Sequence, residues 1–232
     1  PDVHIHRGST FDNAANLAPQ ALEALKERYA GTNLGRQELY AEILDDTEGA
    51  LWTYDNLEQT RRTVEQVPDL LRVVVAIDPA VTNNEGSDET GIVVAGVGVD
   101  GRYYVLDDNS GRMSADVWAR TSVQAYYKYD ADRIVAEVNN GGDLVERLLR
   151  TIDTAVPYTP VTASRGKLVR AEPIAAMYEQ GKVSHVGTFP QLEEQLCTFT
   201  LGSRTSPDRL DALVWALTEL SLSSGKAVWR IS

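Results

Sequence analysis

The chain has 232 residues, of which 43% are hydrophobic and 24% are charged. These proportions are those of a globular protein and exclude an intrinsically disordered chain. No apolar run approaches the roughly 18 residues that a transmembrane helix needs, and the N-terminus lacks the cationic and apolar segments of a secretory signal. The sequence begins without Met and has one cysteine, Cys197, so we expect a processed or excised piece from a reducing compartment.

The charge balance is acidic, with 22 Lys and Arg against 34 Asp and Glu, a formal net charge of −12. A protein that coats nucleic acid passively gains most of its affinity from neutralising phosphates, and therefore carries an excess of basic residues. The balance excludes that class. It leaves room for an enzyme that gathers carboxylates to hold cations and touches nucleic acid through a local basic strip.

The residues before Pro68 predict short helices and no strand. Pro19 can open a helix over 19–31, and Gly31 can end it. A second apolar stripe at helical spacing covers 35–46. Neither helix could bury much surface alone, so this part is predicted to be a connector that docks on a larger body.

After Pro68 the apolar pattern changes to that of strands. The β-branched run over 71–78 is typical of a central strand buried on both faces. Segments 90–100 and 102–109 flank Asp100-Gly101, a strong signal for a two-residue hairpin.

The remaining chain alternates helices and strands. Pro160 should place the segment 158–163 near a sheet edge or a bulge. The predicted elements are helices over 114–129, 142–152, 167–180, 189–197 and 206–222, and strands over 133–138 and 158–163. An antiparallel start followed by this alternation predicts an α/β fold, a mixed sheet with helices on both faces.

Two acidic residues are associated with predicted strands. Asp78 ends an apolar strand, where it is either a turn-former beside Pro79 or a site residue at a sheet end. Glu137 lies between Ala136 and Val138, so it either points to solvent on an edge strand or needs a cation or hydrogen bonds. The turn that follows Glu137 should bring it to the same sheet end as Asp78.

The last predicted helix contributes two more acids. Asp208 falls in its first turn, where an acid is commonly only a partner of the helix dipole. On a helical wheel Asp211 lies at the margin of the stripe that contains Val214, whereas Asp208 points nearly opposite Leu217. Asp211 is therefore expected to lean toward the sheet and to be the stronger candidate ligand.

Carboxylate oxygens suit hard cations such as Mg²⁺ or Mn²⁺. His4, His6 and His185 match no zinc spacing and are expected to be structural or surface residues. Two metals about 3.5–4 Å apart can activate water and stabilise both oxygens of an in-line phosphoryl displacement. Clustered acids repel one another unless a cation neutralises them, so the set favours a metal site.

Four blocks of the sequence resemble, in order, the C-terminal nuclease domain of tailed-phage terminase large subunits. They are AIDPAVTNNEGSDETGIVVAGVGVDGRYYVLDD, IVAEVNNGGDLV, ASRGKLVRAEPIAAMYEQGKVSHV and SPDRLDALVWALTEL, and the similarity spans roughly 73–222. Upstream, GSTFDNAANLAPQALEALKERYAGTNLGRQELYAEIL resembles the segment that joins the packaging ATPase of that family to its nuclease.

The resemblance implies a ribonuclease H-like fold in which three acids bind two divalent metal ions, Mg²⁺ or Mn²⁺. Carried over by position, these acids are Asp78, Glu137 and either Asp211 or Asp208. The pair Asp208 and Asp211 also resembles the terminal-helix acids of Holliday-junction resolvases. Asp88 could approach the metals from a neighbouring loop, although it is also a candidate turn-former.

The same resemblance implies a helical linker over 1–70 and a nuclease domain over 71–232. The phosphate loop of the family's ATPase, GxxxxGK[ST], does not occur, so we expect no ATP hydrolysis by this chain. The implied partners are double-stranded DNA, the packaging ATPase domain of the same full-length protein, the small terminase subunit and the portal. The implied location is the cytoplasm of an infected or prophage-carrying bacterial cell, with no membrane association.

A basic strip over 161–182 is consistent with DNA contact. Arg165 and Lys167 flank Gly166 and, with Arg170, could contact phosphates; a solvated loop entering a helix is the alternative. The expected function is a metal-dependent endonuclease that cuts concatemeric viral DNA during packaging. The alternatives are another ribonuclease H-like enzyme, such as a junction resolvase or RNA–DNA hybrid hydrolase, and a non-catalytic module that guides or docks DNA.

Overall fold

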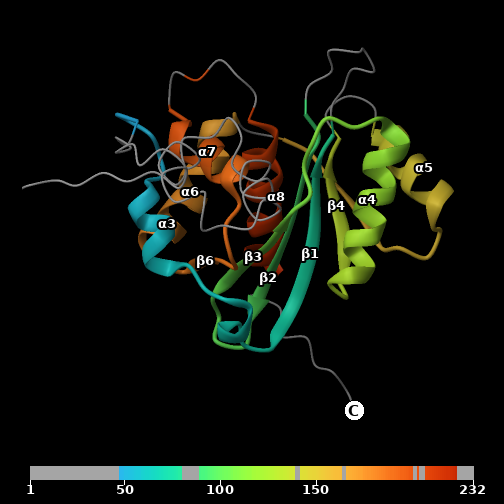
Figure 1. The fold of residues 1–232 in the computed structure, drawn as a ribbon. Coiled ribbons are helices and arrows are strands. Elements are labelled where there is room, and N and C mark those ends of the chain that lie inside the picture. Colours follow the sequence, from blue (N-terminus) through green and yellow to red (C-terminus); the bar gives the residue numbers. More distant parts are fainter. Residues whose placement is uncertain are drawn as a thin grey trace, which may run out of the picture.

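A six-stranded mixed sheet forms the centre of the protein, in the strand order β5-β4-β1-β2-β3-β6 (Figure 1). The computed structural model describes residues 47–79, 89–138, 142–163, 166–200, 203 and 207–223. The strands are β1 (Leu70–Asp78), β2 (Gly91–Gly98), β3 (Tyr103–Asp108), β4 (Arg133–Glu137), β5 (Tyr158–Val161) and β6 (Val183–His185). The helices are α3 (Tyr54–Thr60), α4 (Ala115–Lys128), α5 (Gly142–Ile152), α6 (Lys167–Glu179), α7 (Pro190–Thr198) and α8 (Asp208–Ser223), with a 3₁₀ turn η2 (Val64–Gln66).

The first three strands form an antiparallel meander, and the later strands join it in parallel. β2 pairs antiparallel with both β1 and β3, whereas β4 runs parallel to β1, β5 to β4, and β6 to β3. The predicted hairpin between β2 and β3 is confirmed, but its loop is longer than the two residues expected. The Gly98 N–H donates to the Arg102 carbonyl at 2.9 Å, so residues 99–101 form the loop. Gly101 has φ +76°, and its N–H donates to the Gly98 carbonyl at 2.9 Å. β5 lies at one end of the strand order, as Pro160 predicted.

Helices cover both faces of the sheet (Figure 1). Along β1, Val74 and Ala76 pack with the cluster that includes α6, α7 and α8, while Val75 and Ile77 pack with α4 and α5. Side chains alternate along a strand, so a strand covered on both faces reads as a continuous apolar run. The predicted α/β class, a mixed sheet between two helical layers, is confirmed.

Three short elements of the fold were not predicted, namely α3, the 3₁₀ turn η2 and β6. β6 has only three residues and is held by pairing with β3. α3 packs beside β6 and places Leu57 in the core. The helices predicted over 19–31 and 35–46 lie outside the described residues. Within the described part, no helix is both long and apolar enough to cross a membrane.

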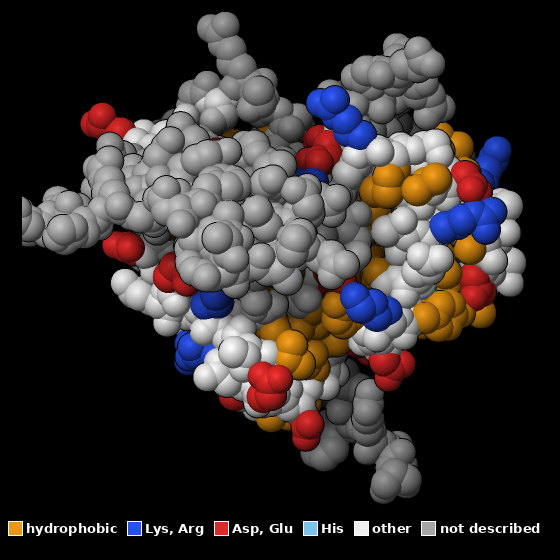
Figure 2. All heavy atoms as spheres, viewed as in Figure 1, with side chains coloured by type: hydrophobic (Ala, Val, Ile, Leu, Met, Phe, Trp, Pro, Cys, Tyr) orange, Lys and Arg blue, Asp and Glu red, His pale blue; other side chains and the backbone are white. Residues whose placement is uncertain are grey.

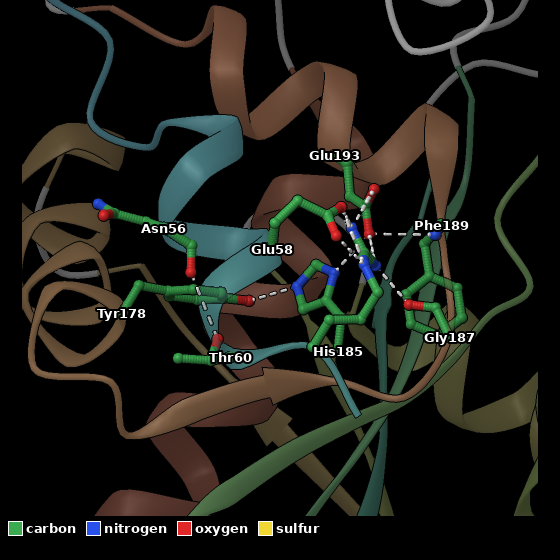
Figure 3. Close-up of polar contacts among 9 residues, drawn as sticks. Asn56, Glu58, Thr60, Tyr178, His185, Gly187, Phe189 and Glu193 are labelled. Carbon is green, nitrogen blue, oxygen red and sulfur yellow. Dashed lines mark hydrogen bonds and ion pairs between the residues drawn. The ribbon is translucent and has the colours of Figure 1, made fainter. Parts of the chain in front are cut away.

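A buried polar network joins α3 to β6 and α7 (Figure 3). His185 Nδ1 lies 2.9 Å from Glu193 Oε1, and His185 Nε2 lies 2.7 Å from the Tyr178 hydroxyl. Arg61, which follows α3, donates from Nη1 to the same Glu193 oxygen at 2.7 Å and also bonds Glu58. His185 is therefore a structural residue, one of the two roles expected for it.

Candidate functional site

Asp78 and Glu137 lie at the carboxyl ends of two neighbouring parallel strands. The pairing of β1 with β4 sets Ile77 opposite Ala136, and each acid is the next residue of its strand. Residues 73–77 of β1 and 134–136 of β4, which precede the acids, are buried, and both acids are half-buried. The expectation that the two carboxyl groups occupy the same end of the sheet agrees with this register, and the solvent-facing alternative for Glu137 does not.

The first turn of α8 packs directly against this end of the sheet. Gly91 pairs with Asp78 across β1 and β2. A Cβ atom at Gly91 would overlap the backbone carbonyl of Asp208 and touch Ala212, so only glycine permits this approach. Asp211 is 1% exposed, while Asp208 in the same turn is half-buried. The helix thus adds Asp211, and beside it Asp208, to the pair of strand carboxylates.

The charges of the other three acids influence the ionisation of Asp78. Burial raises the pKa of Asp78 to about 8, and the negative charges of Asp211 and Glu137, with a smaller effect of Asp208, contribute to the rise against an opposing effect of Lys167. Burial likewise raises the pKa of Asp211, although hydrogen bonding and charge from Lys167 oppose the shift. Without further positive charge, Asp78 retains its proton near neutral pH.

Two basic residues from the start of α6 contact the acids. Lys167 Nζ forms an ion pair with Asp211 Oδ2. Arg170 reaches two acids, with Nη1 3.3 Å from Glu137 Oε2 and Nη2 3.8 Å from Asp211 Oδ1. A single guanidinium spans both carboxylates, so Glu137 and Asp211 lie close together.

Trp215 is a member of the site that sequence reasoning missed. Its indole Nε1 donates to Glu137 Oε2 at 2.6 Å, and the guanidinium carbon of Arg170 lies 4.5 Å from its ring centroid. Trp215 follows Asp211 by four residues, which places the two side chains on one face of α8. The four-residue spacing could have pointed to Trp215. From sequence alone, however, a Trp in an apolar helix is most simply interpreted as a core residue, and only the fold places its indole beside β4.

The donor set fits a hard divalent cation. All four acids offer oxygen ligands, which Mg²⁺ and Mn²⁺ prefer, and the acidic excess is reflected in the raised pKa of Asp78. Across the described ranges, no three Asp, Glu, His or Cys side chains are arranged as a formed metal-ligand cluster. Lys167 pairs with Asp211, and Arg170 with Glu137, at the positions where a cation would bind.

The other residues singled out from the sequence divide into three groups. Lys167 and Arg170 belong to the first turn of α6 and bond the acids directly, which a solvated loop would not do. Arg165, Asp88, His4 and His6 lie outside the described residues. Cys197 is buried in the core. Figure 2 shows Lys and Arg side chains scattered among Asp and Glu over the described part of one face, without a continuous basic surface.

Comparison with protein families identifies the class. Residues 75–220 match the model of the terminase RNaseH-like domain. This match covers more than half of the chain, which therefore belongs to the family of terminase ribonuclease H-like nuclease domains, as its sequence blocks predicted. Membership supports a nuclease role in DNA packaging. No curated protein matches the chain in sequence.

Solved structures share the fold at low sequence identity. The human cytomegalovirus terminase nuclease domain, solved Mn-soaked with an inhibitor bound, is 17% identical with a TM-score of 0.58 over 73% of this chain and 95% of that chain. The nuclease domain of the P22 large terminase is 13% identical with a TM-score of 0.56, covering 75% and 94%. A large terminase from a thermophilic bacteriophage is 16% identical with a TM-score of 0.54, covering 91% of this chain and 55% of that chain.

Proposed function

We propose that this domain is an endonuclease that uses two divalent metal ions, Mg²⁺ or Mn²⁺, to cut concatemeric double-stranded DNA during viral genome packaging. The observation that carries the proposal is the meeting of acids from β1, β4 and α8 at one end of the sheet. Asp78, Glu137 and Asp211 would hold the ions, with Asp208 as the adjacent fourth acid. Bound there, the ions would supply charge neutralisation and activation of water.

The basic residues of α6 take different roles in this proposal. The Lys167 side chain is 38% exposed, so its ammonium can face a DNA phosphate beside the acids. The Arg170 side chain is more buried and is held against Trp215, so it orients Glu137 and Asp211. Arg165 remains a proposed phosphate contact on the grounds of its sequence position.

The proposed partners follow from the family. The chain would act downstream of the packaging ATPase domain of the same full-length protein, together with the small terminase subunit and the portal, in the cytoplasm of a bacterial cell. The similarity to the large terminase of the thermophilic bacteriophage supports this arrangement, because it extends over 91% of the chain. The acidic net charge also fits a domain that receives DNA from a motor rather than capturing it alone.

The direct test is cleavage of supercoiled plasmid with Mn²⁺ or Mg²⁺ by the parent and by Asp78→Asn, Glu137→Gln and Asp211→Asn. We expect each variant to lose more than about 100-fold in rate, since even groups behind a metal ligand cost roughly 10- to 100-fold. Asp116→Asn is the matched control, because Asp116 is an exposed carboxylate on α4 that pairs with the exposed Arg120 one turn away. Equal rates for parent and site variants would refute the assigned site.

Two further measurements separate the alternatives. Comparing duplex, four-way junction and RNA–DNA hybrid substrates distinguishes a packaging nuclease from a resolvase or hybrid hydrolase, and we expect the duplex to be cut. A melting curve with and without Mn²⁺ tests the non-catalytic module, because a ligand that binds the folded state raises the melting temperature. No rise with Mn²⁺, together with no cleavage, would favour the non-catalytic module.

A further inference from the structure

One buried arginine ties the start of α8 to the sheet. Arg209 is 8% exposed, and its Nε donates to Glu89 Oε2 at 2.9 Å while Nη2 donates to Glu89 Oε1. Its Nη1 donates to Asp108 Oδ2 at 2.6 Å. Glu89 directly precedes the bridge residue Thr90, and Asp108 ends β3. The guanidinium therefore links α8 to β2 and β3 at the end of the sheet where β1 presents Asp78.

A glutamine from α7 completes this link. Gln195 Oε1 accepts hydrogen bonds from the backbone N–H groups of Arg209 and Leu210, at 2.9 and 3.2 Å. Gln195 Nε2 donates to Glu89 Oε2 at 3.1 Å. The first N–H groups of a helix have no partner within it, so a side chain that accepts from two of them fixes where the helix begins.

Arg209 cannot contact the reacting groups itself. It sits between Asp208 and Asp211 in one helical turn, and at about 100° per residue its side chain points roughly 160° away from that of Asp211. Its partners are Glu89 and Asp108, both separate from the acids of the proposed site. Any influence on that site must pass through the position of α8.

The backbone of the same turn of α8 lies directly against β2. Gly91 allows the Asp208 carbonyl to lie against β2, and the Arg209 bonds hold the turn in that place. A small displacement of this turn would move Asp208 and Asp211 together relative to Asp78. Sub-ångström placement of ligands controls the affinity of a metal site.

We propose that Arg209, supported by Gln195, is a positioning residue that sets the first turn of α8 and so brings Asp211 and Asp208 into register with Asp78 and Glu137. The proposal rests on the proposed metal-dependent function. It assigns to Arg209 a contribution to divalent-cation affinity, separate from its contribution to folding. A merely structural arginine would lower the melting temperature and leave the affinity of the folded protein unchanged.

The test measures Mn²⁺ binding by calorimetry with the full chain, at a temperature well below the metal-free melting temperature of every variant. We expect Arg209→Gln to raise the Mn²⁺ dissociation constant by about 10- to 100-fold, the usual loss of affinity when a group that orients a metal ligand is removed. Arg209→Lys, which keeps the charge but cannot bridge Glu89 and Asp108 in the same way, should fall between parent and Arg209→Gln. Cleavage by Arg209→Gln should need more Mn²⁺ for half-maximal rate and approach the parental rate at saturation.

Arg120→Gln is the control, because it removes an exposed arginine from its ion pair with Asp116 on α4. If Arg209→Gln does not fold, Gln195→Met tests the same proposal, since it keeps side-chain length and removes the two bonds to the α8 backbone. A folded Arg209 or Gln195 variant that binds Mn²⁺ as tightly as a metal-binding parent overturns this inference alone. A parent that neither binds Mn²⁺ nor cuts DNA overturns the proposed function, and the inference with it.

Discussion

Glu137 is held by two donors of different kinds. The neutral indole N–H of Trp215 and the charged guanidinium of Arg170 both reach Oε2, at 2.6 and 3.3 Å. A half-buried carboxylate without such donors would bear a desolvation cost, and it would be free to rotate away from its neighbours. The indole therefore serves to fix one oxygen of Glu137 in place.

Trp215→Phe tests this arrangement, because phenylalanine keeps an aromatic ring and removes the N–H donor. We expect a loss of about 1–3 kcal/mol in the free energy of unfolding from the unsatisfied carboxylate, measured by urea denaturation, and weaker Mn²⁺-dependent cleavage. Trp52→Phe is the matched control. In the described part of the protein Trp52 Nε1 is buried without an acceptor, so its replacement changes packing alone. Equal Mn²⁺ dependence in both variants would contradict the role of the indole.

Among the helices and strands, the sequence predicted those that a local residue pattern determines. β1, the β2–β3 hairpin and α8 follow from an apolar run, from Asp100-Gly101 and from a helical stripe, and all three are present. β6 was missed because its three residues become a strand only by pairing with β3.

At the site, the acids were visible in the sequence because polar residues interrupt apolar runs. Trp215 and Arg209 were not, because their partners lie 78 and 120 residues away.

The network of Figure 3 shows how elements far apart in sequence are joined by one carboxylate. Burial opposes ionisation of Glu193, but hydrogen bonds and charge from His185 and Arg61 outweigh it and lower its pKa to about 2. The unfolded chain keeps a pKa near 4.5, so below that pH it binds a proton that the folded state does not. The stabilisation is complete above about pH 4.5 and is lost as the pH falls toward 2.

Glu193→Gln should remove this pH-dependent component. We expect the parent to exceed the variant by roughly 3 kcal/mol in unfolding free energy at pH 6, with the difference shrinking as the pH falls from about 4.5 to 2. Urea denaturation across this pH range measures it. Glu58→Gln is the control, because Glu58 bonds the same Arg61 from an exposed position. A parent–variant difference that stays constant with pH would argue against an ionised, hydrogen-bonded Glu193.

For the whole molecule, the main question is where the nuclease body begins. The sequence assigned residues 1–70 to a linker, and the family match starts at residue 75. Yet Trp52 and Leu57 are fully buried in the same core cluster as α8, and Trp52 packs edge-on against Tyr178 with ring centroids 6.2 Å apart. Residue Ala50 also bridges to Thr200, and Arg62 to Val186. We propose that the segment from Ala50 onward works as part of the nuclease body.

Trp52→Ala in the full chain tests this boundary. Removing a fully buried indole should cost about 3–5 kcal/mol in unfolding free energy, a large share of the roughly 5–15 kcal/mol typical of a domain. Val64→Ala, at a position 74% exposed in the same segment, should change it by less than about 0.5 kcal/mol. Chemical denaturation followed by circular dichroism gives both values. Because β6 and α7 pack against this segment, the Trp52 variant should unfold in one transition at a lower denaturant concentration. An unchanged midpoint would show that the segment belongs to the linker and not to the nuclease body.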